Sequence, residues 1–160
     1  MEIKPVNEGT PQFQNFYLRN ITCNGAAKGI FVRGIPEMHV KNIWIENAVL
    51  QADEGIDIQE ASNINLNNVT MLSRNTNPVA YVLNSDNINI TNLKYKDSAD
   101  VLAIVQGERT KNVNILNTDV TKAKQKLNTG FGVTDAVVSW EATPPAPVND
   151  KKKKTKSKTK

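Results

Sequence analysis

Residues 42–47, Asn42-Ile43-Trp44-Ile45-Glu46-Asn47, contain the pattern that decides the fold. An asparagine stands at each end, and aliphatic residues occupy the second and fourth positions. The pattern recurs at residues 15–20, 63–68, 87–92 and 112–117, with Phe16 as the one aromatic variant at the second position. Successive copies start 27, 21, 24 and 25 residues apart, a range in which a repeat is one turn of a stacked architecture. The chain is therefore predicted to be a solenoid.

Each repeat is expected to contain at least two short strands. Apolar and polar residues alternate within the pattern, which is typical of a strand with one buried face. Ile43 and Ile45 are expected to point to one side and Trp44 to the other. A second alternating run follows in most repeats, at residues 30–33, 56–59, 79–83 and 102–105.

The position of the asparagine separates two solenoids with this repeat length, the leucine-rich repeat and the right-handed parallel β-helix. In the leucine-rich pattern the asparagine follows the last inward apolar residue at a greater distance. Here it follows after two residues, as from Ile45 to Asn47. The second half of each repeat also has the pattern of a strand, not of a helix. We therefore expect an all-β fold, a single-stranded right-handed parallel β-helix (a pectin-lyase-like solenoid) of about five coils.

Stacked coils place equivalent residues above one another, about 4.8 Å apart. The second and fourth positions of the pattern are thus expected to form two internal apolar columns. The last asparagine shares their inward parity and is expected at a bend, because asparagine tolerates left-handed backbone and can bond its amide to the neighbouring coil. These structural asparagines are Asn20, Asn47, Asn68, Asn92 and Asn117.

The two ends of the chain differ from the repeats. Residues 1–12 are expected to be an N-terminal extension or partial coil, and residues 13–140 a β-helix with a C-terminal cap in which Trp140 is a lid. Residues 141–160, rich in proline and lysine, are expected to be disordered. Seven of the 20 basic residues lie in residues 151–160, so the remaining 13, set against 16 acidic residues, leave the body at about −3. The lysines are interpreted as a solubilising terminus, with salt-sensitive binding of a polyanion as the alternative.

The composition excludes several kinds of site. Cys23 is the only cysteine, so neither an intrachain disulfide nor a CxxC motif is possible. No stretch approaches the roughly 18 apolar residues of a membrane helix, and residues 1–5 lack the apolar core of a signal peptide. Either the protein is cytoplasmic or the chain is not a whole precursor. No cofactor, metal, nucleic acid or membrane partner is expected, and the oligomeric state is open.

The segment Gly34-Ile35-Pro36-Glu37-Met38-His39-Val40-Lys41-Asn42-Ile43, with residues 20–23 before it and 55–58 after it, resembles a known family. It is similar to the C-terminal coils of bacterial glycoside hydrolase family 28 proteins, the polygalacturonase-like enzymes of pectin breakdown. The resemblance covers roughly residues 10–140. It implies a right-handed parallel β-helix, hydrolysis of galacturonan or rhamnogalacturonan with inversion, a pectic polysaccharide as partner, and an extracellular or periplasmic location for the parent enzyme.

The catalytic motifs of that family are not matched. Inverting hydrolysis needs a carboxylic acid for the leaving oxygen and a carboxylate that activates water, which the family supplies from Asn-x-Asp and Asp-Asp strands, helped by Gly-His-Gly and Arg-x-Lys segments. The chain has no Asp-Asp pair, and His39 has no neighbouring glycine, so we interpret it as a surface or bend residue. Asn117-Thr118-Asp119 matches the first motif but lies in the last coil, and we interpret it as a coincidence of the repeat. Phe31 replaces the arginine of Arg-x-Lys.

No catalytic residue is therefore assigned. We expect the chain to be the C-terminal part of a longer hydrolase whose catalytic coils lie upstream of Met1, and to be inactive by itself. The alternative is a noncatalytic β-helix that serves as a carbohydrate-binding or adhesive surface.

Candidate binding residues follow from the strand face that forms the cleft in the family. Phe31 and Arg33 are expected to point outward there. Arg33 can bind a uronate carboxylate in a two-pronged contact and Tyr81 can stack on a sugar. An ordinary surface is the alternative for this set. The candidate substrate-binding residues are Arg33, Asp57, Gln59 and Tyr81.

Two further groups are given structural interpretations. The acidic cluster is expected to be a solvated edge with Arg33 as ion partner, because nothing in the sequence separates its members into an acid and a base. Tyr17 and Trp44 are expected to pack under a loop. The acidic cluster comprises Asp53, Glu54, Asp57 and Glu60.

Overall fold

The computed structural model describes residues 5–140, which form strands connected by bends and two short 3-10 helices. The predicted disordered tail, residues 141–160, lies outside the described residues. No helix in the described range has the length and apolar character needed to cross a membrane. The strands are β1 (Gln14–Arg33), β2 (Val40–Gln59), β3 (Ala61–Ser73), β4 (Ala80–Leu83), β5 (Asp86–Tyr95), β6 (Ala99–Gln106), β7 (Lys111–Leu116), β8 (Ala123–Gly130) and β9 (Val138–Trp140). The helices are η1 (Val120–Lys122) and η2 (Asp135–Val137).

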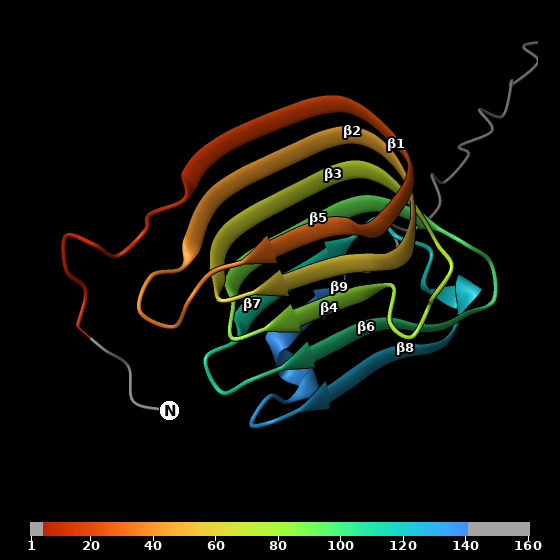
Figure 1. Cartoon of the computed structure of the whole chain (residues 1–160). Helices are drawn as coiled ribbons and strands as arrows, with labels where there is room; N and C mark the ends of the chain where they lie inside the picture. The colour runs from red at the N-terminus through yellow and green to blue at the C-terminus, as the bar shows by residue number, and fades with distance from the viewer. Residues whose placement is uncertain (1–4, 141–160) are drawn as a thin grey trace, which may run out of the picture.

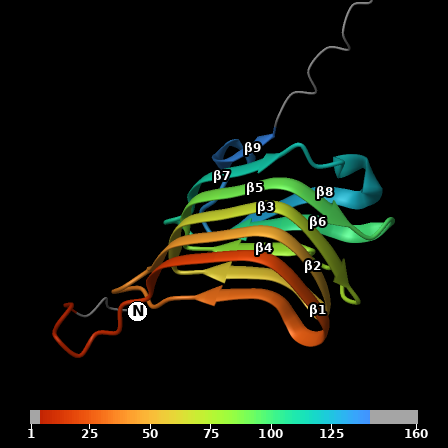
Figure 2. The same cartoon turned by 90° about the horizontal axis from the view of Figure 1, so that it is seen from above.

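The strands stack as a parallel β-helix of about five turns, which confirms the predicted fold class. All eight strand pairings are parallel. The long strand β2 bends along its length, so its first part pairs with β3 and its last part with β4. From there, β3, β5, β7 and β9 continue one wall of the solenoid, and β4, β6 and β8 continue another. Figures 1 and 2 show the coils lying above one another with β1 at one end.

The two predicted apolar columns run through the interior in the expected register. The first column joins Phe16, Ile43, Ile64, Ile88 and Val113. The second joins Leu18, Ile45, Leu66, Ile90 and Ile115. From the second coil onward every member is at most 7% exposed, whereas Phe16 is 47% and Leu18 42% exposed. The two columns are therefore buried from the second coil onward and exposed in the first coil.

The predicted asparagine bends are confirmed, but the predicted inward direction of their side chains is wrong. All five asparagines have left-handed φ angles between 48° and 55°. Side-chain amide hydrogen bonds connect neighbouring coils. Asn68 donates to Asn47 at 2.9 Å, Asn47 donates to Asn20 at 3.4 Å, and Asn117 donates to Asn92. The positive φ interrupts the alternation, so these side chains lie at the outer edge and the next residue, such as Ala48, is buried. Asn92 accepts from Asn117 but donates its own amide to Asn67, at 3.3 Å, and not to Asn68.

The first asparagine of the pattern forms a second bend column that the sequence analysis did not identify. These residues also have left-handed backbone, with φ between 53° and 66°. Asn42 donates to Asn15 at 2.9 Å, and Asn63 donates to Asn42 at 2.8 Å. Each six-residue segment thus begins and ends at an asparagine bend, which explains why the repeated pattern has the same residue at both ends. The column consists of Asn15, Asn42, Asn63, Asn87 and Asn112.

The two apolar columns are covered at their C-terminal end by β9. In β9, Val138 pairs with Val113 and Trp140 pairs with Ile115, so both apolar columns gain a last member. The Lys126 ammonium lies 3.9 Å from the centre of the Trp140 ring. Trp140 therefore covers the column that ends at Ile115, which agrees with its expected role as a lid.

Candidate functional site

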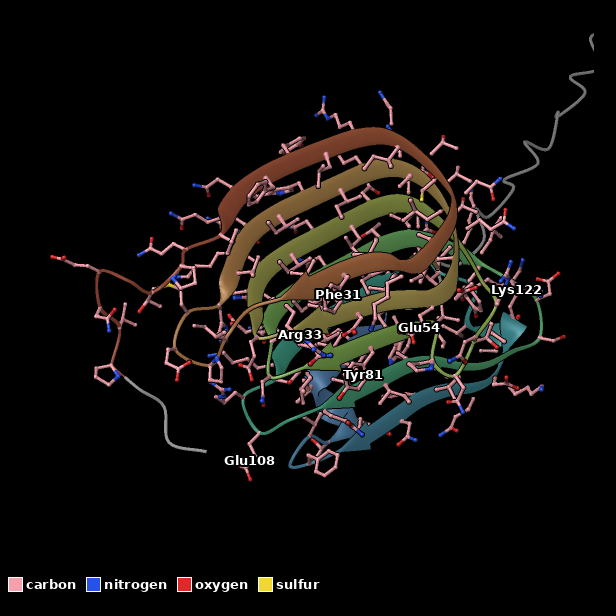
Figure 3. All side chains as sticks on the ribbon, viewed as in Figure 1. Phe31, Arg33, Glu54, Tyr81, Glu108 and Lys122 are labelled. Atoms are coloured by element: carbon pink, nitrogen blue, oxygen red, sulfur yellow. The ribbon has the colours of Figure 1, made fainter. Side chains whose placement is uncertain are left out.

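The candidate binding residues lie side by side on one wall of the solenoid, formed by the ends of β1 and β2 and by β4. Phe31, Asp57 and Tyr81 are in register across three coils, and Arg33 is in register with Gln59. Figure 3 shows Phe31, Arg33 and Tyr81 near one another on the same side of the molecule. The parallel stacking therefore brings together residues that are as far as 50 positions apart in the sequence.

Arg33 is the exposed cation of this wall. Its guanidinium carbon lies 5.3 Å from the centre of the Phe31 ring, and the ring is itself 52% exposed. Within residues 5–140 the guanidinium forms no ion pair with any carboxylate. An unpaired guanidinium can bind a carboxylate in a planar, two-pronged contact. Arg33 is thus the group on this wall with capacity for an anionic ligand.

Asp57 lies on the outer wall, in register with Phe31 and Tyr81 as expected, but neighbouring side chains cover it. Its side chain is buried, and it accepts a bond from Lys28 Nζ at 2.6 Å and from Gln59 Nε2 at 2.7 Å. Lys28 also lies 2.9 Å from Glu54. The hydrogen bond that Lys28 donates to Asp57, followed by the one it donates to Glu54, raises the pKa of the Lys28 ammonium above its ordinary value. The Asp57 carboxylate therefore neutralises the charge of Lys28 and orients the Gln59 amide.

Tyr81 is half-buried beside these groups. Its hydroxyl donates to Gln106 Oε1 at 3.1 Å. Burial raises the pKa of the Tyr81 phenol and the negative charge of Asp57 raises it further, while the positive charge of Arg33 lowers it. A hollow of about 220 Å³ opens beside Tyr81 and Asp57, bounded on the other side by the loop of residues 75–78. One edge of the Tyr81 ring thus lies at the rim of a small depression.

The acidic cluster is divided among three cations, so its expected pairing with Arg33 is wrong. Asp53 forms an ion pair with Arg74 at 2.8 Å. Glu54 and Asp57 both form ion pairs with Lys28, as described above. Glu60 pairs with Arg109, at the bend after β6. Glu60 and Asp57 are both buried, so the prediction of a solvated edge holds only for Asp53 and Glu54. Lys28 belongs to β1, whereas the arginines that pair with Asp53 and Glu60 lie in connections after β3 and β6, where the sequence gives no periodic signal.

His39 lies in the bend between β1 and β2, as expected, but it is part of a polar cluster instead of the free surface. Its Nε2 is 3.3 Å from Glu60 and its Nδ1 3.9 Å from Asp86. Asp119, of the motif-like Asn117-Thr118-Asp119, caps η1 by accepting from the backbone and hydroxyl of Thr121 at 3.0 and 2.6 Å. These Thr121 hydrogen bonds lower the pKa of the Asp119 carboxyl. Asp119 therefore has a structural role.

Tyr17 and Trp44 form an aromatic stack across the first two coils, with ring centres 5.7 Å apart and an interplanar angle of 23°. Tyr17 is more than half exposed, so the expectation that it packs under a loop is wrong. Arg19 lies 4.8 Å from the centre of the Tyr17 ring. Because the two rings face each other along the solenoid axis, the face they share is closed to a sugar ring.

Neither a metal site nor a pair of free carboxylates is formed by the described residues. No group of three or more histidine, cysteine, aspartate or glutamate side chains in residues 5–140 gathers closely enough to hold a metal ion. On the candidate wall, Glu54 and Asp57 share the same ammonium. What the wall offers is a guanidinium, an aromatic ring, an amide and a phenol, a set suited to binding more than to acid-base chemistry.

Comparison with known proteins returns no relative. Neither protein-family models, nor curated proteins, nor solved structures match the chain significantly.

Proposed function

We propose that this chain binds an acidic pectic polysaccharide along the wall formed by β1, β2 and β4, as the C-terminal part of a polygalacturonase-like glycoside hydrolase, and that it does not cleave the polymer by itself. The observation that supports the proposal best is Arg33, an exposed guanidinium without an ion pair in the described chain. Each galacturonate unit presents one carboxylate, the anion that a guanidinium binds in two-pronged fashion.

The neighbours of Arg33 suit a sugar. Gln59, its register partner in the next coil, is fixed by Asp57 and retains its amide oxygen as an acceptor for a hydroxyl. The exposed Phe31 ring offers an apolar surface of the kind on which the C–H face of a sugar ring packs. The polymer is expected to run across the coils, because Arg33, Gln59 and Tyr81 come from three successive turns.

The ion pairs of the wall support a chain without catalytic activity. An inverting hydrolase needs one carboxylic acid and one carboxylate on opposite sides of the scissile bond, with room for a water molecule. Glu54 and Asp57 are instead joined by Lys28, at 2.9 and 2.6 Å. The same observation supports the second candidate function, a noncatalytic β-helix that binds or adheres to carbohydrate without any further coils.

Calorimetric titration with galacturonate oligomers tests the binding proposal. We expect Arg33→Ala to weaken binding about 5- to 30-fold, the loss of one or two charge-assisted hydrogen bonds. Arg19→Ala is the matched control, because Arg19 is an arginine of the same strand on another wall, paired with Glu46. Equal affinity of the wild type and Arg33→Ala for the oligomers would remove the basis of the proposal.

An assay of reducing ends tests the absence of cleavage. The purified chain should release none from galacturonan or rhamnogalacturonan. Release that disappears in Asp57→Asn would show that the chain is itself a hydrolase. Binding without release would leave the two candidate functions, which differ in whether the natural polypeptide contains catalytic coils; sequencing the coding region upstream of Met1 separates them.

A further inference from the structure

Asn24-Gly25 is the one place in the sequence where an asparagine precedes a glycine. In such a pair the main-chain nitrogen of the glycine can attack the side-chain amide of the asparagine, because glycine has no Cβ to obstruct the approach. The asparagines of the repeated pattern precede larger residues, as Asn20 precedes Ile21. The chemistry of the pair therefore distinguishes Asn24 from every other asparagine of the chain.

Gly25 is the extra residue of a bulge in β1. Asn24 pairs with Gln51 and Ala26 pairs with Ala52, so two steps along β1 correspond to one step along β2. The extra residue of a bulge is left unpaired and the ladder around it is disrupted. Gly25 has a positive φ of 92°, and no atom beyond the adjacent residues lies within 4 Å of the position that a Cβ would occupy. The peptide group between Asn24 and Gly25 thus has room to turn.

The side chain of Asn24 is exposed and its amide is free. Within residues 5–140 it forms neither a hydrogen bond nor an ion pair, whereas the amide of Asn47 is bonded to the coils on both of its sides. The exposure does not depend on β1 being the first coil of the sequence. Gln51, the register partner of Asn24, is also exposed, although it pairs with β1 on one side and with β3 on the other.

We propose that Asn24 is a self-modification site, at which the folded protein converts asparagine to aspartate and isoaspartate without an enzyme. The Gly25 nitrogen gives its proton to solvent base and forms a bond to Cγ of Asn24, and the side-chain nitrogen leaves as ammonia. Water then opens the five-membered succinimide. Opening at the side-chain carbonyl gives aspartate, and opening at the main-chain carbonyl gives isoaspartate. The sequence of steps consumes one water molecule, releases one ammonia molecule and needs no oxidant or reductant.

The fold has room for both products. Aspartate adds one negative charge at an exposed position. Isoaspartate adds one carbon to the main chain, at a point where β1 already holds an extra residue. Neither apolar column includes Asn24 or Gly25. The modified chain should therefore keep its β-helix and differ in charge. This inference concerns the chain itself and does not rest on the proposed carbohydrate function.

Incubation of the purified protein in heavy-oxygen water, at neutral and at mildly alkaline pH, is the direct test. Digestion with trypsin in ordinary water then releases residues 20–28 as one peptide, because Arg19 and Lys28 are the cleavage points, and this peptide contains both Asn20 and Asn24. Mass spectrometry should show loss of the amide and uptake of heavy oxygen at Asn24, faster at the higher pH. Asn20 should keep its amide, which makes it an internal control.

Ala48→Gly is the matched control variant. It creates a second asparagine-glycine pair at Asn47, whose amide is bonded to Asn20 and Asn68 and whose neighbours pair without a bulge. In this variant, with its fold checked by circular dichroism, Asn47 should keep its amide while Asn24 loses its own. Equal loss at Asn47 would overturn the proposal, because it would show that the dipeptide and not the bulge decides. Persistence of the Asn24 amide in the folded wild type, while a synthetic peptide of residues 20–28 loses it, would overturn it as well.

Discussion

The carboxylate of Glu60 accepts two hydrogen bonds from Nη2 of Arg109, at 2.8 and 2.7 Å, although the residues are 49 positions apart in the sequence. Glu60 stands at the bend after β2 in left-handed backbone, with φ of 48°. It also accepts from Asn84 Nδ2 at 2.9 Å and lies 3.3 Å from His39 Nε2. The four residues belong to the bends after β1, β2, β4 and β6, so one buried carboxylate joins four successive coils.

Arg109→Ala should destabilise the fold because it leaves the Glu60 carboxylate, with a side chain only 12% exposed, without its main cation. Breaking a fully buried pair costs about 3–5 kcal/mol, and since the arginine is itself 37% exposed we expect about 1–3 kcal/mol. Urea unfolding provides the measurement. Arg74→Ala is the control, because the Arg74–Asp53 pair is exposed and should contribute about 0–1 kcal/mol. Equal losses in the two variants would contradict a structural role for Glu60.

The asparagine bends can be separated into a backbone and a side-chain contribution. Asn47 has φ of 55°, accepts from Asn68 and donates to Asn20. Asn47→Gly keeps the left-handed backbone and loses both side-chain hydrogen bonds. Asn47→Ala loses the same two hydrogen bonds and also strains the left-handed backbone. We expect Ala to be less stable than Gly by about 1 kcal/mol in thermal or urea unfolding. A Gly variant no more stable than Ala would show that the left-handed conformation is not the reason for asparagine at this bend.

The repeated parts of the fold could be predicted from the sequence because their signal is local. Ile43 and Ile45 recur with the same alternation in other coils, and the spacing of the copies is enough to place them in two columns. The direction of the Asn47 side chain could not be predicted in the same way, since the period of two fails at a residue with positive φ.

The ion partners of the candidate site were not predictable for a related reason. The repeats differ in length, from 21 to 27 residues, and the difference lies in the connecting segments. Lys28 and Arg33 both belong to β1, and which of them reaches Asp57 depends on the conformations of the long side chains, which no periodic pattern specifies. Lys28 precedes β1's last inward residues and bonds to Asp57, while Arg33 points to the exposed wall. The position of Arg33 itself was predictable because it lies within a regular strand.

Gly55 allows two coils to approach closely. A Cβ at this position would lie 2.1 Å from the backbone oxygen of Val79, an atom that cannot move without disturbing the parallel pairing of β2 and β4. Gly55→Ala should therefore destabilise the protein by about 3 kcal/mol or more. Gly130→Ala is the matched control, because its Cβ would meet nothing nearer than Gln106 Nε2 at 3.5 Å, and a change within about 1 kcal/mol is expected. Unfolding in urea compares the two, and a mild effect at Gly55 would contradict the close approach.

Tyr95 should make stability fall at alkaline pH. Its hydroxyl donates to the Asp119 carbonyl oxygen at 2.6 Å, and burial, with smaller effects of Asp119 and Asp97, raises its pKa from 10.0 to about 12. Below pH 10 the phenol is protonated in both the folded and the unfolded chain, so its contribution is complete. Between pH 10 and 12 the unfolded chain ionises first, which favours unfolding, and the contribution is lost as the pH passes the folded pKa.

The raised pKa of Tyr95 sets the size of the alkaline loss of stability, and Tyr95→Phe is its control. A pKa difference of about two units corresponds to a loss of at most about 3 kcal/mol between pH 9 and pH 13. Tyr95→Phe cannot ionise, and the bond it loses to Asp119 costs the same at every pH. The difference in free energy of unfolding between wild type and Tyr95→Phe should therefore shrink as the pH rises through this range, because other alkaline titrations cancel in the comparison. Parallel stability curves for the two proteins would show that the Tyr95 phenol is not held in its neutral form by the fold.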